Sequence, residues 1–340
     1  MRDEAIQQYY GSTLAGSGDL KTGACCSPDS IPDYLRGWLG ELPREVNERF
    51  YGCGSPIPAA IAGATVLDLG CGTGRDAFLV SRLVGAEGRV IGLDMTPRQL
   101  EVARRAQAAH RDTTGLDNLD FRDGVIEDLA AAGIADASVD VVISNCVLNL
   151  SSDKSRVLAE VFRVLKPGGE LFFADVYGDR RIPPELLDDP VLRGECLAGA
   201  LYPEDFRRML ARLGVDDHRV VARSPVPLLD ADIEARIGMI AFESLTVRAF
   251  KLELEDRCED FGQFATYRGD IPHHPHRFVL DDHHVFERDR PMAVCGNTAA
   301  MLSQTRYAPH FEVSARRAHF GLFDCGPTPA GGEAGAAGCC

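Results

Sequence analysis

The sequence predicts an α/β fold, in which helices cover both faces of a mostly parallel sheet, followed by a smaller α+β domain. Two observations support this prediction. Strand-like and helix-like stretches alternate between about residues 51 and 225, and such alternation is typical of parallel sheets. From about residue 226 the alternation stops, and a helical start is followed by longer strand-like stretches.

Five segments are predicted to be strands, because β-branched or aromatic residues run together in them and small or polar residues end them. In chain order they are 65–70, 89–94, 119–124, 139–145 and 170–176. The intervening segments 97–110 and 153–166 have the apolar spacing of amphipathic helices. This repeated order of strand and helix predicts parallel strands with helices on both faces of the sheet.

The chain is predicted to divide into four parts that differ in composition. They are a polar N-terminal segment with Cys25 and Cys26 (1–50), the α/β domain (51–225), the smaller α+β domain (226–325), and a Gly/Ala/Pro-rich tail that ends in Cys339 and Cys340 (326–340). The strand-like segments 240–254 and 261–269 fall in the third part, so we expect both in the smaller domain. The composition of the tail predicts a flexible segment.

Charge and hydropathy exclude several classes of function. The formal net charge is −15, whereas binding to a nucleic acid backbone needs a basic face. No apolar run approaches the roughly 18 residues of a membrane span, and the chain starts with charges where a signal peptide is apolar. We therefore expect a cytoplasmic protein without nucleic acid or membrane partners. Thiols stay reduced there, so the eleven cysteines are expected to serve packing, ligation or redox chemistry.

Three motifs in order indicate a cofactor site at the ends of the first three strands. The loop DLGCGTGRD (68–76) follows the first strand, and its glycines allow a tight turn and close approach to a ligand. Asp94 ends the second strand, where a carboxylate can accept hydrogen bonds from both hydroxyls of a ribose. After the third strand, Ile126 can pack on an adenine face and Glu127 can accept its amino group. The alternative is a set of ordinary strand-end turns.

Three cysteines are predicted to converge near the same edge of the sheet. Cys146 follows the fourth strand, Cys196 lies in the long connection after the fifth strand, and Cys53 precedes the first strand. Three thiolates would hold a soft, thiophilic acceptor. The alternative is that these cysteines are buried packing residues, which is the usual role of an isolated cysteine.

Residues 65–225 resemble the class I S-adenosylmethionine-dependent methyltransferases, and short cysteine motifs narrow the resemblance to arsenite methyltransferases. The motifs are YYG (9–11), GACC (23–26), YGCG (51–54), SNCVLNL (144–150), GECLAGALY (194–202) and VCGNTAAML (294–302). The resemblance implies a Rossmann-like fold with a seven-stranded, mostly parallel sheet. It adds two C-terminal strands, one of them antiparallel, and segment 218–224 is a candidate for one of the two.

The resemblance also implies site residues. Family thiols that match Cys146 and Cys196 hold trivalent arsenic, and those that match Cys53 and Cys25 act as a further ligand and in redox turnover. Cys26, beside Cys25, leaves open which thiol of that pair acts. Family residues around the cofactor match Tyr51, Gly70, Asp94, Met95, Thr96, Gln99, Ile126 and Glu127, and we add Asp68, Gly72, Gly74 and Asn145 from the strand ends.

The expected function is methyl transfer from S-adenosylmethionine to thiol-bound trivalent arsenic, supplied as arsenite or methylarsenite thiol adducts. A thiol reductant, thioredoxin or glutathione, is expected to support turnover. Two alternatives stay open: a methyltransferase for a small organic acceptor, and a non-catalytic metalloid-binding or redox protein. Cys71 is interpreted as a buried filler, and Cys258, Cys295 and Cys325 as structural. Cys339 and Cys340 could bind a metalloid or simply belong to a frayed tail.

Overall fold

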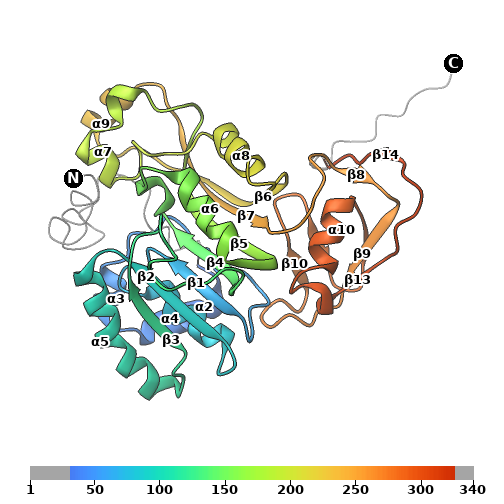
Figure 1. Ribbon diagram of the computed structural model, residues 1–340, viewed down its shortest axis with the longest axis horizontal. Coiled ribbons are helices and arrows are strands. Elements are labelled where there is room, and N and C mark those ends of the chain that lie inside the picture. Colours follow the sequence, from blue (N-terminus) through green and yellow to red (C-terminus); the bar gives the residue numbers. More distant parts are fainter. Residues whose placement is uncertain (1–30, 326–340) are drawn as a thin grey trace.

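A computed structural model describes residues 31–325, and residues 1–30 and 326–340 lie outside the described part. The chain forms a seven-stranded sheet with helices on both faces and a small domain near its C-terminal end (Figure 1). This arrangement confirms the predicted fold class. Among the helices of residues 31–325, none is both long and apolar enough to cross a membrane.

The sheet has the strand order β3-β2-β1-β4-β5-β7-β6, with β7 antiparallel to both of its neighbours. Its strands are β1 (Thr65–Leu69), β2 (Arg89–Asp94), β3 (Leu119–Asp123), β4 (Val139–Asn145), β5 (Leu165–Gly178), β6 (His218–Pro225) and β7 (Phe242–Phe250). The first five strands run parallel, so their carboxyl ends lie along one edge of the sheet. The strand order changes direction between β1 and β4, and ligands of open α/β sheets bind at such a point, beyond the carboxyl ends of the strands.

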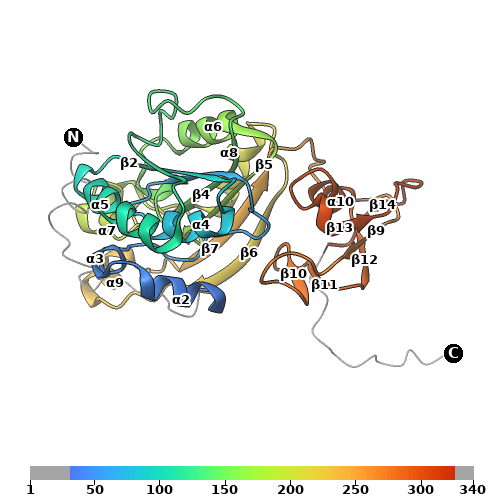
Figure 2. The same ribbon diagram turned by 90° about the horizontal axis from the view of Figure 1, so that it is seen from below.

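Two helical layers enclose the sheet (Figure 2). One layer contains α2 (Asp33–Glu41), α3 (Arg44–Glu48), α4 (Arg75–Val84) and α5 (Pro97–Thr114). The opposite layer contains α6 (Lys154–Val164) and α8 (Pro203–Ala211), whose apolar residues pack on the other face of the central strands. The short helices α7 (Pro190–Gly194) and α9 (Ala231–Ile237) flank the predicted acceptor thiols, because residues of both belong to the same apolar cluster as those cysteines.

One strand lies elsewhere than we expected. Segment 240–254 was expected in the smaller domain, but its central part forms β7, which inserts between β5 and β6 of the main sheet. Most residues of β7 are buried, including the polar Ser244 and Arg248, which fits a strand covered on both faces. A strand-like composition does not specify which sheet the strand joins. Segment 218–224 is confirmed as a member of the main sheet, as β6.

The small domain follows β7 and has a core of its own. Its strands form a three-stranded sheet and two antiparallel pairs: β12 (Pro291–Val294), β9 (Gln263–Tyr267) and β13 (Phe311–Val313); β10 (Arg277–Val279) with β11 (Val285–Glu287); and β8 (Glu259–Asp260) with β14 (Gly321–Leu322). A single α-helix, α10 (Gly296–Ser303), packs against β9 and β13 within these described residues. The backbone N–H of Asp282 donates to the carbonyl of Val220, which joins the domain to β6.

A buried ion-pair group fastens the small domain to the sheet. Glu170 on β5 is fully buried, and its carboxylate pairs with Arg248 on β7 and with Arg306 of the small domain. Glu170 Oε1 and Arg248 Nε are 2.9 Å apart but not aligned for a hydrogen bond. One carboxylate therefore balances two buried guanidinium groups across the join between the domains.

We expect Glu170→Gln to destabilise the protein by about 3–5 kcal/mol, since it leaves two buried cations without a counter-charge. Chemical denaturation measures this change in the free energy of unfolding. Arg207→Ala removes an exposed pair with Glu204 and serves as the control, because exposed pairs contribute little. Equal stability of the Glu170→Gln variant and the wild type would contradict the proposed role of this group.

Candidate functional site

A cleft lies at the carboxyl ends of β1, β2 and β4. Clefts at this edge of an open α/β sheet are typical small-molecule sites. Every residue that the sequence predicted for the cofactor, except Gly74, lines it: Tyr51, Asp68, Gly70, Gly72, Asp94, Met95, Thr96, Gln99, Ile126, Glu127 and Asn145. The predicted site residues therefore gather in one place, although their individual roles stay predictions.

The glycine loop after β1 has the backbone shape that its composition predicts. Gly70 and Gly74 have φ angles of 67° and 85°, in the left-handed region that side chains disfavour. A Cβ at Gly74 would lie 2.8 Å from the ring of Phe121, so this glycine permits close packing at the start of α4. Gly74 therefore allows the loop to pack against Phe121 and does not line the cleft.

Backbone N–H groups from two loops bind the carboxylate of Asp94: one from the loop after β1 and one from the turn after β2. The N–H groups of Gly72 and Thr96 each donate to one of its carboxylate oxygens at 2.8 Å. Burial raises the pKa of Asp94, and these two hydrogen bonds oppose the rise. The Thr96 side chain also donates to this carboxylate, whose two oxygens together offer about four acceptor sites, so the carboxylate is positioned to accept a further hydrogen bond from a ligand.

Asp68 carries an unsatisfied acceptor in the same cleft. Its Oδ2 is buried and has no hydrogen-bond partner within residues 31–325. Burial raises the pKa of Asp68 well above its usual range, and the nearby carboxylates of Asp76 and Asp94 raise it further. A buried acceptor among like charges favours a cationic or hydrogen-bond-donating ligand.

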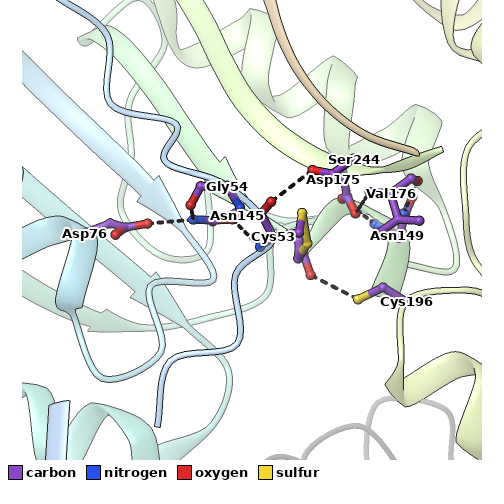
Figure 3. Close-up of a disulfide and its surroundings, with 10 residues drawn as sticks. Cys53, Gly54, Asp76, Asn145, Asn149, Asp175, Val176, Cys196 and Ser244 are labelled. Carbon is purple, nitrogen blue, oxygen red and sulfur yellow. Dashed lines mark hydrogen bonds between the residues drawn. A yellow bond between two sulfur atoms is a disulfide. The ribbon is translucent and has the colours of Figure 1, made fainter. Parts of the chain in front are cut away.

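Asn145, at the end of β4, binds the loop before β1 to the sheet (Figure 3). Its side-chain oxygen accepts hydrogen bonds from the N–H groups of Cys53 (2.9 Å) and Gly54 (3.2 Å). Its amide nitrogen donates to the carbonyl of Gly54 at 3.0 Å and to the carboxylate of Asp76 at 2.8 Å. One side chain therefore fixes the position of Cys53 relative to the cleft.

The three predicted acceptor cysteines are all buried and belong to one cluster. Cys53 and Cys146 are joined by a disulfide, and the thiol of Cys196 donates to the carbonyl oxygen of Cys146 at 3.4 Å (Figure 3). Cys146 also lines the cofactor cleft. The thiol cluster and the cleft thus meet at Cys146.

Two of these cysteines have an unusual backbone conformation. Cys146 and Cys196 have φ angles of 59° and 61°, a left-handed conformation that is uncommon outside glycine and concentrates at functional sites. Gly199 packs directly on the turn after Cys146, because a Cβ there would lie 1.9 Å from the carbonyl oxygen of Asn149. Gly199 of the motif GECLAGALY therefore lets the Cys196 loop approach the turn that follows β4.

The structure contains a disulfide that the sequence analysis did not anticipate. Cys53, expected to act with Cys25 or Cys26 in redox turnover, is bonded to Cys146 in this structure. Their Cα atoms are 5.8 Å apart because Asn145 brings the Cys53 loop to the end of β4. Cys25 and Cys26 lie outside the described residues, so their redox role stays a prediction.

Sequence reasoning missed Asp175, whose carboxylate lies within 4.8 Å of the sulfur atoms of Cys53 and Cys146. Burial raises its pKa to about 7, against the N–H groups of Val176 and Asn149, which donate to the carboxylate. The available signal was its position in β5, close to the edge at which Asp68 and Asn145 lie.

The comparisons with known proteins agree with the resemblance that the sequence motifs indicate. Residues 61–214 match the family model described as a methyltransferase domain, and residues 262–328 match the arsenite methyltransferase C-terminal domain. An arsenite methyltransferase of Aquipseudomonas alcaligenes is 51% identical over 95% of this chain and 94% of its own length. The human arsenite methyltransferase is 39% identical over 91% of this chain and 82% of its own length.

A solved structure extends the likeness to three dimensions. The arsenic(III) S-adenosylmethionine methyltransferase of Chlamydomonas reinhardtii has a TM-score of 0.83 and 50% identity. The match covers 86% of this chain and all of that structure.

We expect Asp94→Ala to weaken binding of S-adenosylmethionine by about 2–3 kcal/mol, the range for losing hydrogen bonds to a charged group. Calorimetry measures this affinity. Asp123→Ala is the matched control, because Asp123 pairs in register with Asp94 at the end of β3 but does not line the cleft. Similar affinities for the two variants would remove Asp94 from the binding site.

Proposed function

Because this chain belongs to the arsenite methyltransferase family, we propose that it methylates trivalent arsenic held by the thiolates of Cys53, Cys146 and Cys196. The observation that carries this assignment is the position of Cys146, which lines the cofactor cleft and also belongs to the buried thiol cluster. An acceptor bound by these thiols would lie next to the methyl donor.

The cleft fits S-adenosylmethionine. Asp94, fixed by two backbone N–H groups, would accept hydrogen bonds from the ribose hydroxyls. The unsatisfied oxygen of Asp68 would accept from a charged amino group, and Ile126 and Glu127 would contact the adenine. When bound, the cofactor supplies an electrophilic methyl group on a positively charged sulfur.

The three thiols would bind arsenic by ligand exchange. Each thiol loses a proton and replaces one hydroxide of arsenite, so three As–S bonds form and three water molecules leave. The product has no net charge, which suits a buried site. Arsenic keeps a lone pair, and three sulfur ligands set its direction.

Positioning supplies most of the catalysis that this arrangement offers. Aligning a bimolecular step can contribute about 7–11 kcal/mol. Asn145 positions the Cys53 loop against the end of β4, and Gly199 allows the Cys196 loop to approach the same point. Burial of the thiols excludes water, which favours a transfer that reduces the charge on the donor.

Electron balance gives the disulfide a role. When the arsenic lone pair forms the bond to carbon, arsenic is formally oxidised to the pentavalent state. Release of a trivalent product requires two electrons, which two coordinating thiolates provide when their As–S bonds break and one S–S bond forms. The Cys53–Cys146 bond supports this step because it joins two of the proposed ligands.

A dithiol such as thioredoxin, or two molecules of glutathione, would then return the disulfide to two thiols by exchange. The cytoplasm supplies such reductants, and we propose it as the site of action. Cys25 or Cys26 would act in this exchange by forming a transient bond with Cys53. That bond would free Cys146 for the next arsenic.

The two alternative functions make different predictions. A methyltransferase for an organic acceptor would tolerate thiol blocking, and a non-catalytic binding protein would not consume the cofactor. Incubation with arsenite, labelled S-adenosylmethionine and a reductant, followed by identification of the arsenic species, separates all three. Labelled methylarsenicals are the result we expect.

We expect Cys146→Ser and Cys196→Ser each to abolish methylation of arsenite and of methylarsenite, while S-adenosylmethionine still binds. Serine is a hard, neutral donor at pH 7 and does not replace a thiolate on a soft centre. Product analysis and calorimetry measure the two quantities, with the wild-type protein as the reference. Near-normal turnover in either variant would return that cysteine to a packing role.

We expect Cys25→Ser and Cys53→Ser to suppress methylation of arsenite but to retain much of the second methylation, from methylarsenite. Methylarsenite has already exchanged one ligand for carbon, so two thiols suffice to hold it. Rates on both substrates, with disulfides mapped by mass spectrometry after one turnover, test this prediction. Equal losses on both substrates and no bond from Cys53 to Cys25 or Cys26 would exclude the exchange step.

A further inference from the structure

Three further cysteines meet in the small domain, away from the cofactor cleft. The sulfur atoms of Cys258, Cys295 and Cys325 all lie within 4.8 Å of one another. Cys258 directly precedes β8, Cys295 is the N-cap of α10, and Cys325 follows β14. These three elements lie together in the small domain (Figures 1 and 2). The fold thus gathers thiols from three separate segments.

The group differs from ordinary packing cysteines. Cys295 is fully buried, whereas Cys258 and Cys325 are partly exposed, so the group is accessible from one side. None of the three belongs to the apolar core cluster of the small domain. Each sulfur lies within hydrogen-bonding reach of the other two.

The surroundings of Cys295 favour a thiolate, whereas hydrogen bonding with Cys295 raises the pKa of the Cys258 thiol to about 11. The backbone N–H of Thr298 donates to the sulfur of Cys295 at 3.4 Å, and a guanidinium nitrogen of Arg219 lies 3.9 Å from that sulfur. Arg219 also pairs with Asp217 and Asp281, which hold its guanidinium against the thiol group. A nearby cation and donated N–H groups stabilise sulfur in the charged form that binds soft ions.

The number of sulfur donors in this group fits trivalent arsenic better than structural zinc. Within residues 31–325, no fourth histidine, cysteine or carboxylate belongs to this group. Structural zinc takes four ligands in a tetrahedron. Trivalent arsenic is satisfied by three sulfur ligands and keeps its lone pair, as at the proposed acceptor site.

We propose that Cys258, Cys295 and Cys325 form a second binding site for trivalent arsenic. Binding forms three As–S bonds, releases the three hydroxides of arsenite as water with the three thiol protons, and transfers no electrons. This proposal rests on the proposed function only for the choice of arsenic as the bound ion. None of the three cysteines lines the cofactor cleft, so arsenic bound here is held without being methylated.

Occupancy of this site would cross-link the small domain. Arsenic would join β8, the start of α10 and the segment after β14. Arg219 lies on β6, so the cross-link would form directly beside the main sheet. We expect arsenite to raise the thermal stability of the protein through this site.

Native mass spectrometry without S-adenosylmethionine tests the proposal independently of methyl transfer. The full chain carries Cys339→Ser and Cys340→Ser, so that the vicinal thiols of the tail do not contribute, and a phosphine keeps the remaining thiols reduced. We expect two arsenic atoms per chain. Adding Cys258→Ser or Cys295→Ser should leave one, and the matched control Cys71→Ser should retain two, because Cys71 belongs to neither thiol group.

A second protein isolates the proposed site: it carries Cys53→Ser, Cys146→Ser and Cys196→Ser, and both vicinal pairs, Cys25–Cys26 and Cys339–Cys340, are also replaced by serine. We expect it to bind one arsenic with three sulfur ligands by X-ray absorption, and to gain thermal stability with arsenite. Adding Cys258→Ser should remove both effects, and the partly exposed position of Cys258 limits damage to folding.

Three outcomes would overturn the proposal. They are the absence of arsenic from the isolated site, arsenic that remains after Cys258→Ser, and stoichiometric zinc that arsenite does not displace. The last outcome would identify a zinc site instead.

Discussion

The amide of Asn145 is the interaction on which the arrangement of the functional site depends. It ends β4, and its four hydrogen bonds tie the Cys53 loop and Asp76 to the sheet. An amide suits this position because it offers a donor and an acceptor group without bringing a further charge among buried carboxylates. Cys146 is the next residue, so the same strand end that organises the cofactor cleft also presents an acceptor thiol.

Charge in the cleft is arranged for a positively charged ligand. Asp68, Asp76 and Asp94 lie around one glycine loop, and burial together with mutual repulsion raises the pKa of Asp68. A cation placed among them lowers the cost of keeping these carboxylates ionised. The repulsion among these carboxylates therefore favours a cationic ligand over a neutral one in this cleft.

Sulfur chemistry recurs at two places with different surroundings. Cys53, Cys146 and Cys196 lie beside the cleft, with Asp175 close to two of the sulfurs. Cys258, Cys295 and Cys325 lie beside Arg219, away from the cleft. Buried carboxylates oppose the formation of thiolates, whereas a guanidinium favours it. On this basis the first group suits a neutral complex and the release of two electrons from a pair of thiols, and the second group suits persistent binding.

The sequence by itself determined the parallel strands, the glycine loop and most of the residues predicted to line the cleft, because these depend on local periodicity and on positions at strand ends. Asp68, Asp94 and Glu127 were found in this way, and the cysteine motifs located Cys146 and Cys196. Tertiary structure decided the rest. It inserted β7 between β5 and β6, joined Cys53 to Cys146, placed Asp175 beside them, and gathered three cysteines in the small domain. These outcomes depend on contacts between segments far apart in the chain. A strand-like segment or a single cysteine carries no information about its distant partner.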